Sequence, residues 1–330
     1  MNFQFSLGDH MLVDSGVAPS IFSQILPDLH FVSHAHSDHY QKVRNYSKIA
    51  ASEETKEVME ARGKRGIETE SLGNGFKMLD AGHVLGSKQL HASIDGASIL
   101  YSGDYQIASP ILGKRIEITE ADVLVIDSTY SSLGINFDDK NETITAIQHY
   151  VKQKVNAGSV LFTAYAFGKA QELIKIINEI GIVPTVSEEI AKISNVYVRH
   201  GTKLYYFPYT PGGELKGNFV GIFTSKDAER IAAVLSQNSK RYFTAVATGW
   251  AKIFKFNTSV QFALSDHADF KQALEYISAV NPRTIVPVGD GAETFAKRLN
   301  RLGYNAIGRE SHEAYNHNWQ FQLQLTAEKC

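Results

Sequence analysis

The segment His34-Ala35-His36-Ser37-Asp38-His39 contains the residue types most able to do chemistry. In an extended segment, residues two apart point to the same side, so His34 and His36 can bind one metal ion. In a helix they would not face each other, because only residues three or four apart do. A bend after His36 would aim Asp38 and His39 at a second ion. A solvated histidine-rich turn is the alternative, but this density of ligands directly after an apolar strand favours a metal site.

The remaining ligands must come from distant segments and must be histidines or carboxylates. The single cysteine, Cys330, allows neither an internal disulfide nor a thiolate cluster. Candidate ligands are His83 in Ala-Gly-His-Val-Leu-Gly-Ser, Asp104 in Tyr-Ser-Gly-Asp-Tyr and His267 in Ser-Asp-His-Ala-Asp-Phe. Imidazole and carboxylate ligands suit Zn²⁺, and Mn²⁺ is chemically possible.

The composition is that of a globular protein with a large core. The chain has 330 residues, 43% of them hydrophobic, enough for one large domain or two ordinary ones. A net charge of −2 gives no global field that would attract nucleic acid, so such binding would need a local patch or bound metal ions. Residues 1–10 show no signal-peptide pattern, and no apolar run reaches membrane-spanning length. We therefore expect a cytoplasmic protein with no membrane contact.

Several expected strands end on a polar residue that could take part in chemistry. The apolar runs 11–13, 29–32, 98–101 and 123–126 lead respectively to Asp14, the histidine segment, Asp104 and Asp127. This pattern predicts a site at one edge of a sheet.

The pattern changes after about residue 135, where expected helices and strands alternate. Apolar spacing predicts helices at 142–155, 168–180 and 227–235, and strands at 160–162, 219–223 and 242–246. Such alternation favours a small parallel α/β layer. The strands expected at 260–264 and 284–288 and the helix at 271–280 then resemble the beginning of the chain. The predicted organisation is one fold built from residues 1–134 and 255–330, with an inserted domain at 135–254.

Taken together, these motifs resemble those of the metallo-β-lactamase superfamily, over nearly the whole chain. The matching positions are the strand-end Asp14, the HxHxDH segment 34–39, His83 and Asp104. HxHxDH alone marks only the superfamily. The β-CASP nucleases within it add an acidic residue in a segment such as Asp127-Ser-Thr-Tyr and a histidine such as His267. The stretch 162–172 resembles the family's cap strand and the start of its next helix. The stretch 247–251, followed by the His267 segment, looks most like ligase-associated DNA exonucleases and archaeal RNA 3′-end processing factor-like proteins.

The resemblance implies an α/β fold, a metallo-β-lactamase αββα sandwich with an inserted α/β β-CASP cap. It implies that the first metal is held by His34, His36, His83 and Asp104, and the second by Asp38, His39 and Asp104. The implied activity is hydrolysis of DNA or RNA phosphodiester bonds by metal-activated water, in an exonuclease-like manner at a single-stranded end.

The resemblance also implies catalytic roles beyond the metal ligands. His267 would act as a general acid or phosphate contact, since imidazole titrates near neutral pH. A plain alternative is that Ser265-Asp266 simply caps the following helix. Asp14 and Asp127 would orient histidines by accepting their ring N–H groups. For Asp14, a turn residue before Ser15-Gly16 is the competing interpretation.

One motif departs from the family pattern. RNA-cleaving members usually carry a Val-His-Gly segment whose histidine binds the second metal, but residues 285–291 read Ile-Val-Pro-Val-Gly-Asp-Gly. We therefore expect one firmly bound Zn²⁺ and a weaker second ion, and the missing histidine favours DNA. Asp290 could supply an oxygen ligand or could be an ordinary turn residue.

Two other functions compete with a nuclease. One is a metallo-hydrolase of a small ester or thioester, as in the glyoxalase II branch, which the inserted segment and the His267 motif disfavour. The other is a silent nucleic-acid-binding relative, although such proteins typically lose several metal ligands.

Several residues of the inserted segment could touch the substrate. Lys169 could bind a phosphate at a helix start, Tyr165 and Trp250 could stack on bases, and Lys252 and Lys255 could contact the backbone. Aromatic core packing and an ordinary solvated face are the alternatives.

Overall fold

The computed structural model describes residues 5–7, 11–14, 29–41, 43–94, 96–210, 212–213 and 215–308. Ser15, Gly16 and Cys330 lie outside them. The chain forms two compact units, residues 137–266 and the residues on either side of that segment. Among the described residues, no helix combines the length and apolar content needed to cross a membrane.

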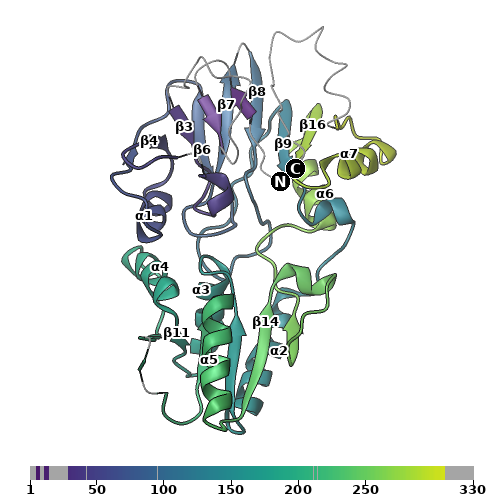
Figure 1. The fold of residues 1–330 in the computed structure, drawn as a ribbon. Helices are drawn as coiled ribbons and strands as arrows, with labels where there is room; N and C mark the ends of the chain where they lie inside the picture. Colours follow the sequence, from purple (N-terminus) through teal and green to yellow (C-terminus); the bar gives the residue numbers. More distant parts are fainter. Residues whose placement is uncertain are drawn as a thin grey trace. The chain divides into compact units, whose positions relative to one another are not determined.

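The first unit contains two sheets. In one, the strand order is β1 (Phe5–Leu7), β2 (Met11–Val13), β3 (Leu29–Phe31), β4 (Lys48–Ala50) and β5 (Glu68–Thr69). In the other it is β16 (Thr284–Val288), β9 (Val123–Asp127), β8 (Ala97–Tyr101), β7 (Lys88–Ile94) and β6 (Phe76–Asp80) (Figure 1). Both are mixed: β1 pairs antiparallel with β2, as do β6 with β7 and β7 with β8, while the other pairs are parallel.

Alternating side chains build the layers of this unit. Val125 packs with Val13, Phe31 and Ala50 of the other sheet. Its neighbours Leu124 and Ile126 point to the opposite face, where they pack against helices α6 (Phe270–Val280) and α7 (Ala292–Arg301). Helix α1 (Glu53–Ala61) contacts β5 of the first sheet. The result is a layered α/β arrangement consistent with a metallo-β-lactamase-like fold.

Helix α6 begins with a capping box. Asp269 accepts a hydrogen bond from Gln272 N at 2.9 Å, and Gln272 Oε1 accepts one from Asp269 N at 3.0 Å. The alternative in which Ser265-Asp266 caps this helix is therefore wrong, because Asp269 is the cap. His267 precedes the cap by two residues and is not part of the helix.

The second unit is built on a parallel sheet, as the alternation of helices and strands predicts. Its strand order is β12 (Phe207–Pro208), β11 (Thr185–Val186), β13 (Val220–Phe223), β10 (Ser159–Thr163), β14 (Tyr242–Ala247) and β15 (Val260–Phe262). Because β15 pairs with β14, this compact unit continues to Asp266, beyond the expected end at residue 254.

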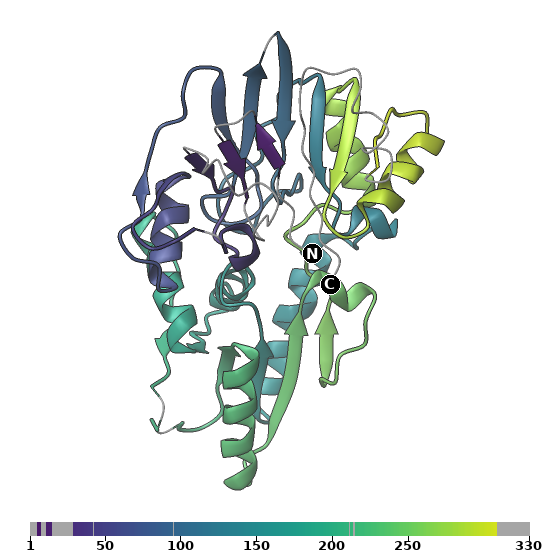
Figure 2. The same cartoon turned by 45° about the horizontal axis from the view of Figure 1, so that its top comes forward.

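Helices cover both faces of this sheet (Figures 1 and 2). Leu161 of β10 packs against Ile231 and Leu235 of α5 (Ser225–Gln237). The next residue, Phe162, stacks on Phe262 with ring centroids 6.4 Å apart. Phe262 in turn meets Tyr150 of α2 (Lys140–Val155) on the opposite face. The remaining helices of this unit are α3 (Lys169–Asn178) and α4 (Glu188–Arg199).

Candidate metal centre

The histidine segment leaves β3 in an extended conformation and then bends. His36 has φ −73° and ψ 140°, and the short 3₁₀ helix η1 (Ser37–His39) follows it. The extended backbone places His34 Nε2 2.8 Å from His36 Nδ1. The turn brings His39 Nε2 to 3.5 Å from Asp104 Oδ2.

His83 and Asp104 reach the same place from two other strand ends. His83 follows β6, and its Nε2 lies 3.2 Å from His36 Nδ1. Asp104 follows β8, and its Oδ2 lies 3.4 Å from His34 Nε2 and 3.7 Å from His83 Nε2. Gly82 beside His83 has φ +75°, and a Cβ there would lie 2.3 Å from the carbonyl oxygen of Gln106, so this approach requires glycine.

The donor set fits a divalent metal ion. One ligand atom from each of His34, His36, His83 and Asp104 lies within 4.8 Å of the others. Each neutral imidazole has one nitrogen with a free lone pair, so three such nitrogens and a carboxylate oxygen this close together can all bind one cation. Three imidazoles and one carboxylate are a typical ligand set for such an ion.

The electrostatics of the site differ between its histidines. Burial, together with the neighbouring His39, lowers the pKa of His34 well below its usual value, which keeps the ring in the neutral form that binds metal. Burial also acts to lower the pKa of His39, but Asp104 and Asp14 outweigh it and raise that pKa well above its usual value. Burial alone would raise the pKa of Asp104, but the neighbouring His39, His267 and His34 outweigh burial and hold this pKa well below its usual value.

These shifts predict the pH dependence of metal uptake. Because its pKa is raised, His39 keeps its proton to higher pH in the metal-free protein and must lose it to bind an ion, so binding should release protons and strengthen as pH rises. Calorimetric titration with Zn²⁺ in two buffers of different ionisation enthalpy measures this release. In Asp14→Asn the release should be smaller, because one of the charges that raise the pKa of His39 is removed. Equal release in both proteins would contradict this origin of the shift.

Asp14 lies behind His39 in a buried hydrogen-bond network. Its Oδ2 is 3.0 Å from His39 Nδ1 and accepts bonds from Ser33 Oγ at 2.5 Å and Tyr101 OH at 2.8 Å. Its Oδ1 accepts the backbone N–H of Ser33 at 2.7 Å. This carboxylate therefore orients the His39 ring, and the structure does not present Asp14 as a simple turn residue. Ser33 and Tyr101 are parts of the site that sequence reasoning missed.

The Tyr101 hydroxyl should contribute measurably to stability. Tyr101→Phe removes a buried hydrogen bond to a carboxylate, so we expect a loss of about 1.5–3 kcal/mol in the free energy of unfolding. Urea denaturation of the metal-free protein measures it. Tyr165→Phe is the matched control because its side chain is 65% exposed, and it should change stability by less than about 0.5 kcal/mol. Equal effects of the two substitutions would show that the Tyr101 hydroxyl contributes nothing to stability.

His267 pairs with Asp127 beside the candidate metal ligands. Its Nδ1 lies 3.1 Å from Asp127 Oδ2, and its Nε2 lies 3.7 Å from Asp104 Oδ2. Asp127 Oδ1 accepts the N–H and hydroxyl of Thr129 at 3.0 and 2.7 Å. Gln106 Nε2 donates to the carbonyl oxygen of His267 at 2.8 Å, a contact that joins residues 161 positions apart.

Two carboxylates considered as metal ligands, Asp38 and Asp290, are exposed and lie outside the converging group. The Asp38 side chain is 59% exposed, and its Oδ2 lies 3.7 Å from His39 Nε2. Asp290 is exposed in the turn after β16. Neither belongs to a converging group of potential ligands among the residues that the structure describes.

Arg62 supports the histidine segment from behind. This residue ends α1, and its Nη1 donates to the carbonyl oxygen of Ala35, between His34 and His36, at 2.9 Å. A helix-end arginine is a poor sequence signal for such a role, so this contact was not foreseen.

Lys169, considered from the sequence as a phosphate contact, is buried and paired with carboxylates. It is 3% exposed and forms ion pairs with Glu172 at 2.5 Å and Asp266 at 3.6 Å. Two carboxylates of the second unit therefore compensate its charge.

Comparison with known proteins shows relatives with nuclease and ligase names. A probable DNA ligase of Opitutus terrae is 27% identical over 300 residues, which cover 85% of this chain and 29% of the ligase. An RNase J-like protein of Methanocaldococcus jannaschii is 39% identical over 106 residues, 31% of this chain and 25% of that protein. The chain thus spans less than a third of the length of either relative.

A shorter relative is covered almost completely. An uncharacterized protein encoded in the lig 3′ region of Acidianus ambivalens is 30% identical over 129 residues, 38% of this chain and 89% of that protein. No family model matches. In structure, the chain resembles a crystal structure of a protein of unknown function from Enterococcus faecalis V583, with a TM-score of 0.60, 13% identity and 92% of this chain and 93% of that chain covered. That likeness shows the fold. By its relatives, the chain belongs to the β-CASP nuclease family of the metallo-β-lactamase superfamily.

Proposed function

We propose that the chain is a metal-dependent nuclease that hydrolyses phosphodiester bonds. The observation that carries this proposal is the convergence of His34, His36, His83 and Asp104, with the His267–Asp127 pair beside them, in a chain with nuclease relatives. Such a site can neutralise the charge that develops on a phosphate.

The residues have distinct proposed roles. His34, His36, His83 and Asp104 would hold a firmly bound Zn²⁺, because three imidazoles and a carboxylate suit this ion. His39, Asp38 and Asp104 would hold a second, weaker ion, for which Mn²⁺ is an alternative. When bound, the ions acidify water for attack and stabilise negative charge on the phosphoryl oxygens.

The His267–Asp127 pair is suited to protonating the leaving oxygen. The carboxylate of Asp127 accepts the Nδ1–H of His267, which leaves Nε2 as the atom that can carry a transferable proton. Asp127 also stabilises the imidazolium form, and Thr129 holds Asp127 in place through two hydrogen bonds. This is the arrangement of a general acid and its orienting carboxylate.

We assign the unit 137–266 as the β-CASP cap, inserted into a metallo-β-lactamase αββα sandwich formed by the flanking residues. This assignment is supported by a parallel sheet with helices on both faces, which the chain inserts between the two segments of the layered unit. The inserted cap also disfavours the alternative function, a glyoxalase II-like hydrolase of a small thioester.

We further propose single-stranded DNA ends as the preferred substrate. A match covering 85% of this chain is to a protein named as a probable DNA ligase, and the stretch 285–291 lacks the histidine that RNA-cleaving family members usually carry there. Exonuclease-like action is part of this proposal.

Cleavage assays test the proposal directly. End-labelled single-stranded DNA and RNA of equal sequence are incubated with the metal-stripped protein, alone and with Zn²⁺ or Mn²⁺, beside a generic thioester. The expected result is metal-dependent shortening of the nucleic acid, faster for DNA, with the thioester intact. Hydrolysis of the thioester without cleavage of either nucleic acid would overturn the nuclease assignment.

A further inference from the structure

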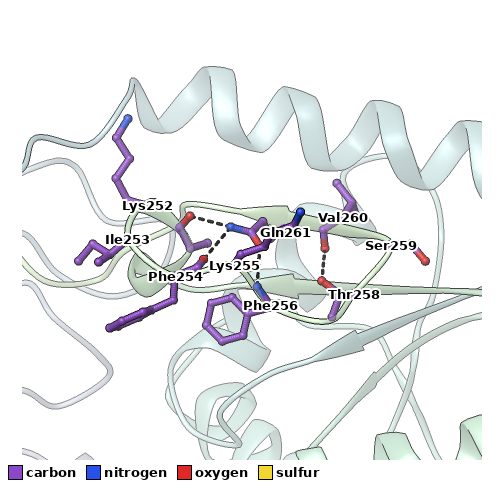
Figure 3. Close-up of a pocket in the computed structure, with 10 residues that line it drawn as sticks. Lys252, Ile253, Phe254, Lys255, Phe256, Thr258, Ser259, Val260 and Gln261 are labelled. Carbon is purple, nitrogen blue, oxygen red and sulfur yellow. Dashed lines mark hydrogen bonds between the residues drawn. The ribbon is translucent and has the colours of Figure 1, made fainter.

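A groove in the second unit combines an exposed aromatic ring with positive charge. Residues 251–256 and 258–261 line it, and it encloses about 470 Å³, within the range of small-molecule sites, about 300–1,000 Å³ (Figure 3). It lies where the 3₁₀ helix η3 (Gly249–Lys252) leads into the edge strand β15. The segment 249–262 contains two lysines and no acidic residue.

The side-chain amide of one residue, Gln261, holds the loop that forms the groove. Gln261 Nε2 donates to the carbonyl oxygens of Ala251 at 2.8 Å and Phe254 at 2.9 Å, and its Oε1 accepts the N–H of Phe256 at 2.9 Å (Figure 3). Thr258 Oγ1 also donates to the carbonyl oxygen of Val260 at 2.9 Å. Three hydrogen bonds from the Gln261 side chain therefore fix the backbone of residues 251–256, which carries Phe254.

Phe254 presents a ring to solvent from this fixed backbone. It is 56% exposed, and its ring centroid lies 5.7 Å from that of Trp250. In Figure 3 the rings of Phe254 and Phe256 lie on one side of the loop, and the Lys252 side chain extends from the other. A single exposed aromatic residue is ordinary, but a pair of tilted rings on a rigid loop is a ready surface for stacking a planar group.

The two lysines of the groove differ in their availability. Lys252 Nζ lies 2.9 Å from both carboxylate oxygens of Asp138, so its charge is already compensated. Lys255 is exposed and has no acidic partner among the residues that the structure describes. An anionic ligand would therefore meet Lys255.

We propose that this groove binds single-stranded nucleic acid, with an unpaired base stacked on Phe254 and a backbone phosphate at Lys255. A planar ring next to an uncompensated cation matches the alternation of bases and phosphates along a single strand. Because the chain has a net charge of only −2, a local patch of this kind supplies the attraction that the whole molecule does not. The inference rests on the proposed nuclease function and adds a substrate contact to it.

Binding without cleavage tests the contact. The affinity of the full chain for fluorescent single-stranded DNA and RNA oligonucleotides is measured by anisotropy in EDTA, so that no cleavage occurs. Phe254→Ala and Phe254→Leu should weaken binding about tenfold, whereas Phe254→Trp should restore it, because stacking needs a π face. Lys255→Ala should weaken binding and reduce the slope of log affinity against log salt by about 0.7.

Matched controls come from the same unit. Phe207→Ala removes a ring that is 63% exposed, and Lys226→Ala removes an exposed lysine of α5. Both should bind like the wild type. Unchanged affinity in Phe254→Ala and an unchanged salt slope in Lys255→Ala, with a wild type that binds, would overturn the groove contact alone.

The same assay separates the two proposals. A wild type that binds but does not cleave when metal is restored, with the two groove variants weakened, would leave the contact standing and refute the nuclease function. A wild type that neither binds nor cleaves any oligonucleotide would refute both.

Discussion

Asp38→Ala should reduce cleavage of nucleic acid to the rate of the metal-free protein while leaving the fold intact. The Asp38 side chain is 59% exposed, so its removal should change the free energy of unfolding by less than about 0.5 kcal/mol. A loss of activity would therefore report on the site and not on folding. The physical reason for the loss is that Asp38 lies beside His39, where its carboxylate would help to hold the second metal ion.

The measurement compares initial cleavage rates, metal content and thermal unfolding for the wild type and this variant. Asp290→Ala is the matched control, because Asp290 is also an exposed acidic residue after a strand of the first unit and belongs to no converging ligand group in the described chain. It should cleave like the wild type. Undiminished activity in Asp38→Ala would mean that this aspartate has no part in catalysis. Loss of activity in Asp290→Ala instead would assign the missing ligand to the turn after β16.

His267→Ala should lower the rate of phosphodiester cleavage by about 10²–10⁴-fold while the protein still binds metal. The imidazole is 3.1 Å from Asp127 and 3.7 Å from Asp104, near the proposed ligands but with its Nδ1 bonded to a carboxylate. Its proposed task is to protonate the leaving oxygen. The effect should therefore depend on how much protonation the leaving group needs.

A p-nitrophenyl ester of thymidine monophosphate distinguishes this role from metal binding, because p-nitrophenolate leaves without a proton. The variant should cleave this ester at nearly the wild-type rate. Asp127→Asn should show the same pattern with a smaller loss, about 10–100-fold, since it acts only through His267. An equal loss on both substrates, accompanied by lost metal, would show that His267 is a ligand and not an acid.

The converging side chains could be predicted from the sequence because each stands next to a strand end. Asp127 ends an apolar run and Asp104 lies three residues after another, and parallel pairing of β8 with β9 brings those ends to one edge. The extended spacing of His34 and His36 places both rings on one side, as two-residue periodicity requires.

The supporting residues could not be predicted, because their partners are chosen by topology. Tyr101 reaches Asp14 across 87 positions, and Gln106 reaches His267 across 161. Nothing in the local spacing of a tyrosine or a glutamine indicates such a partner. Arg62 likewise reaches Ala35 only because α1 ends beside the histidine segment.

The sequence contains patterns for two features of the fold that the expected elements do not include, the cap of α6 and the helix α4. The Asp269…Gln272 pair is a capping box, and it places the start of α6 at Phe270, one residue before the expected start at residue 271. Helix α4 shows helical apolar spacing at Ile190, Ile193 and Tyr197, although it is not among the expected elements. The end of the second unit, in contrast, depends on the pairing of β15 with β14, which no local pattern reveals.

We expect His34, His36, His83 and Asp104 to hold a divalent metal ion at which phosphodiester cleavage takes place. The most direct measurement is an anomalous difference map at the zinc absorption edge, from crystals of active protein supplied with Zn²⁺. We expect a strong peak among these four side chains and a weaker one beside His39 and Asp38. Active crystals with no peak at the four side chains, or with zinc bound only elsewhere, would contradict this expectation.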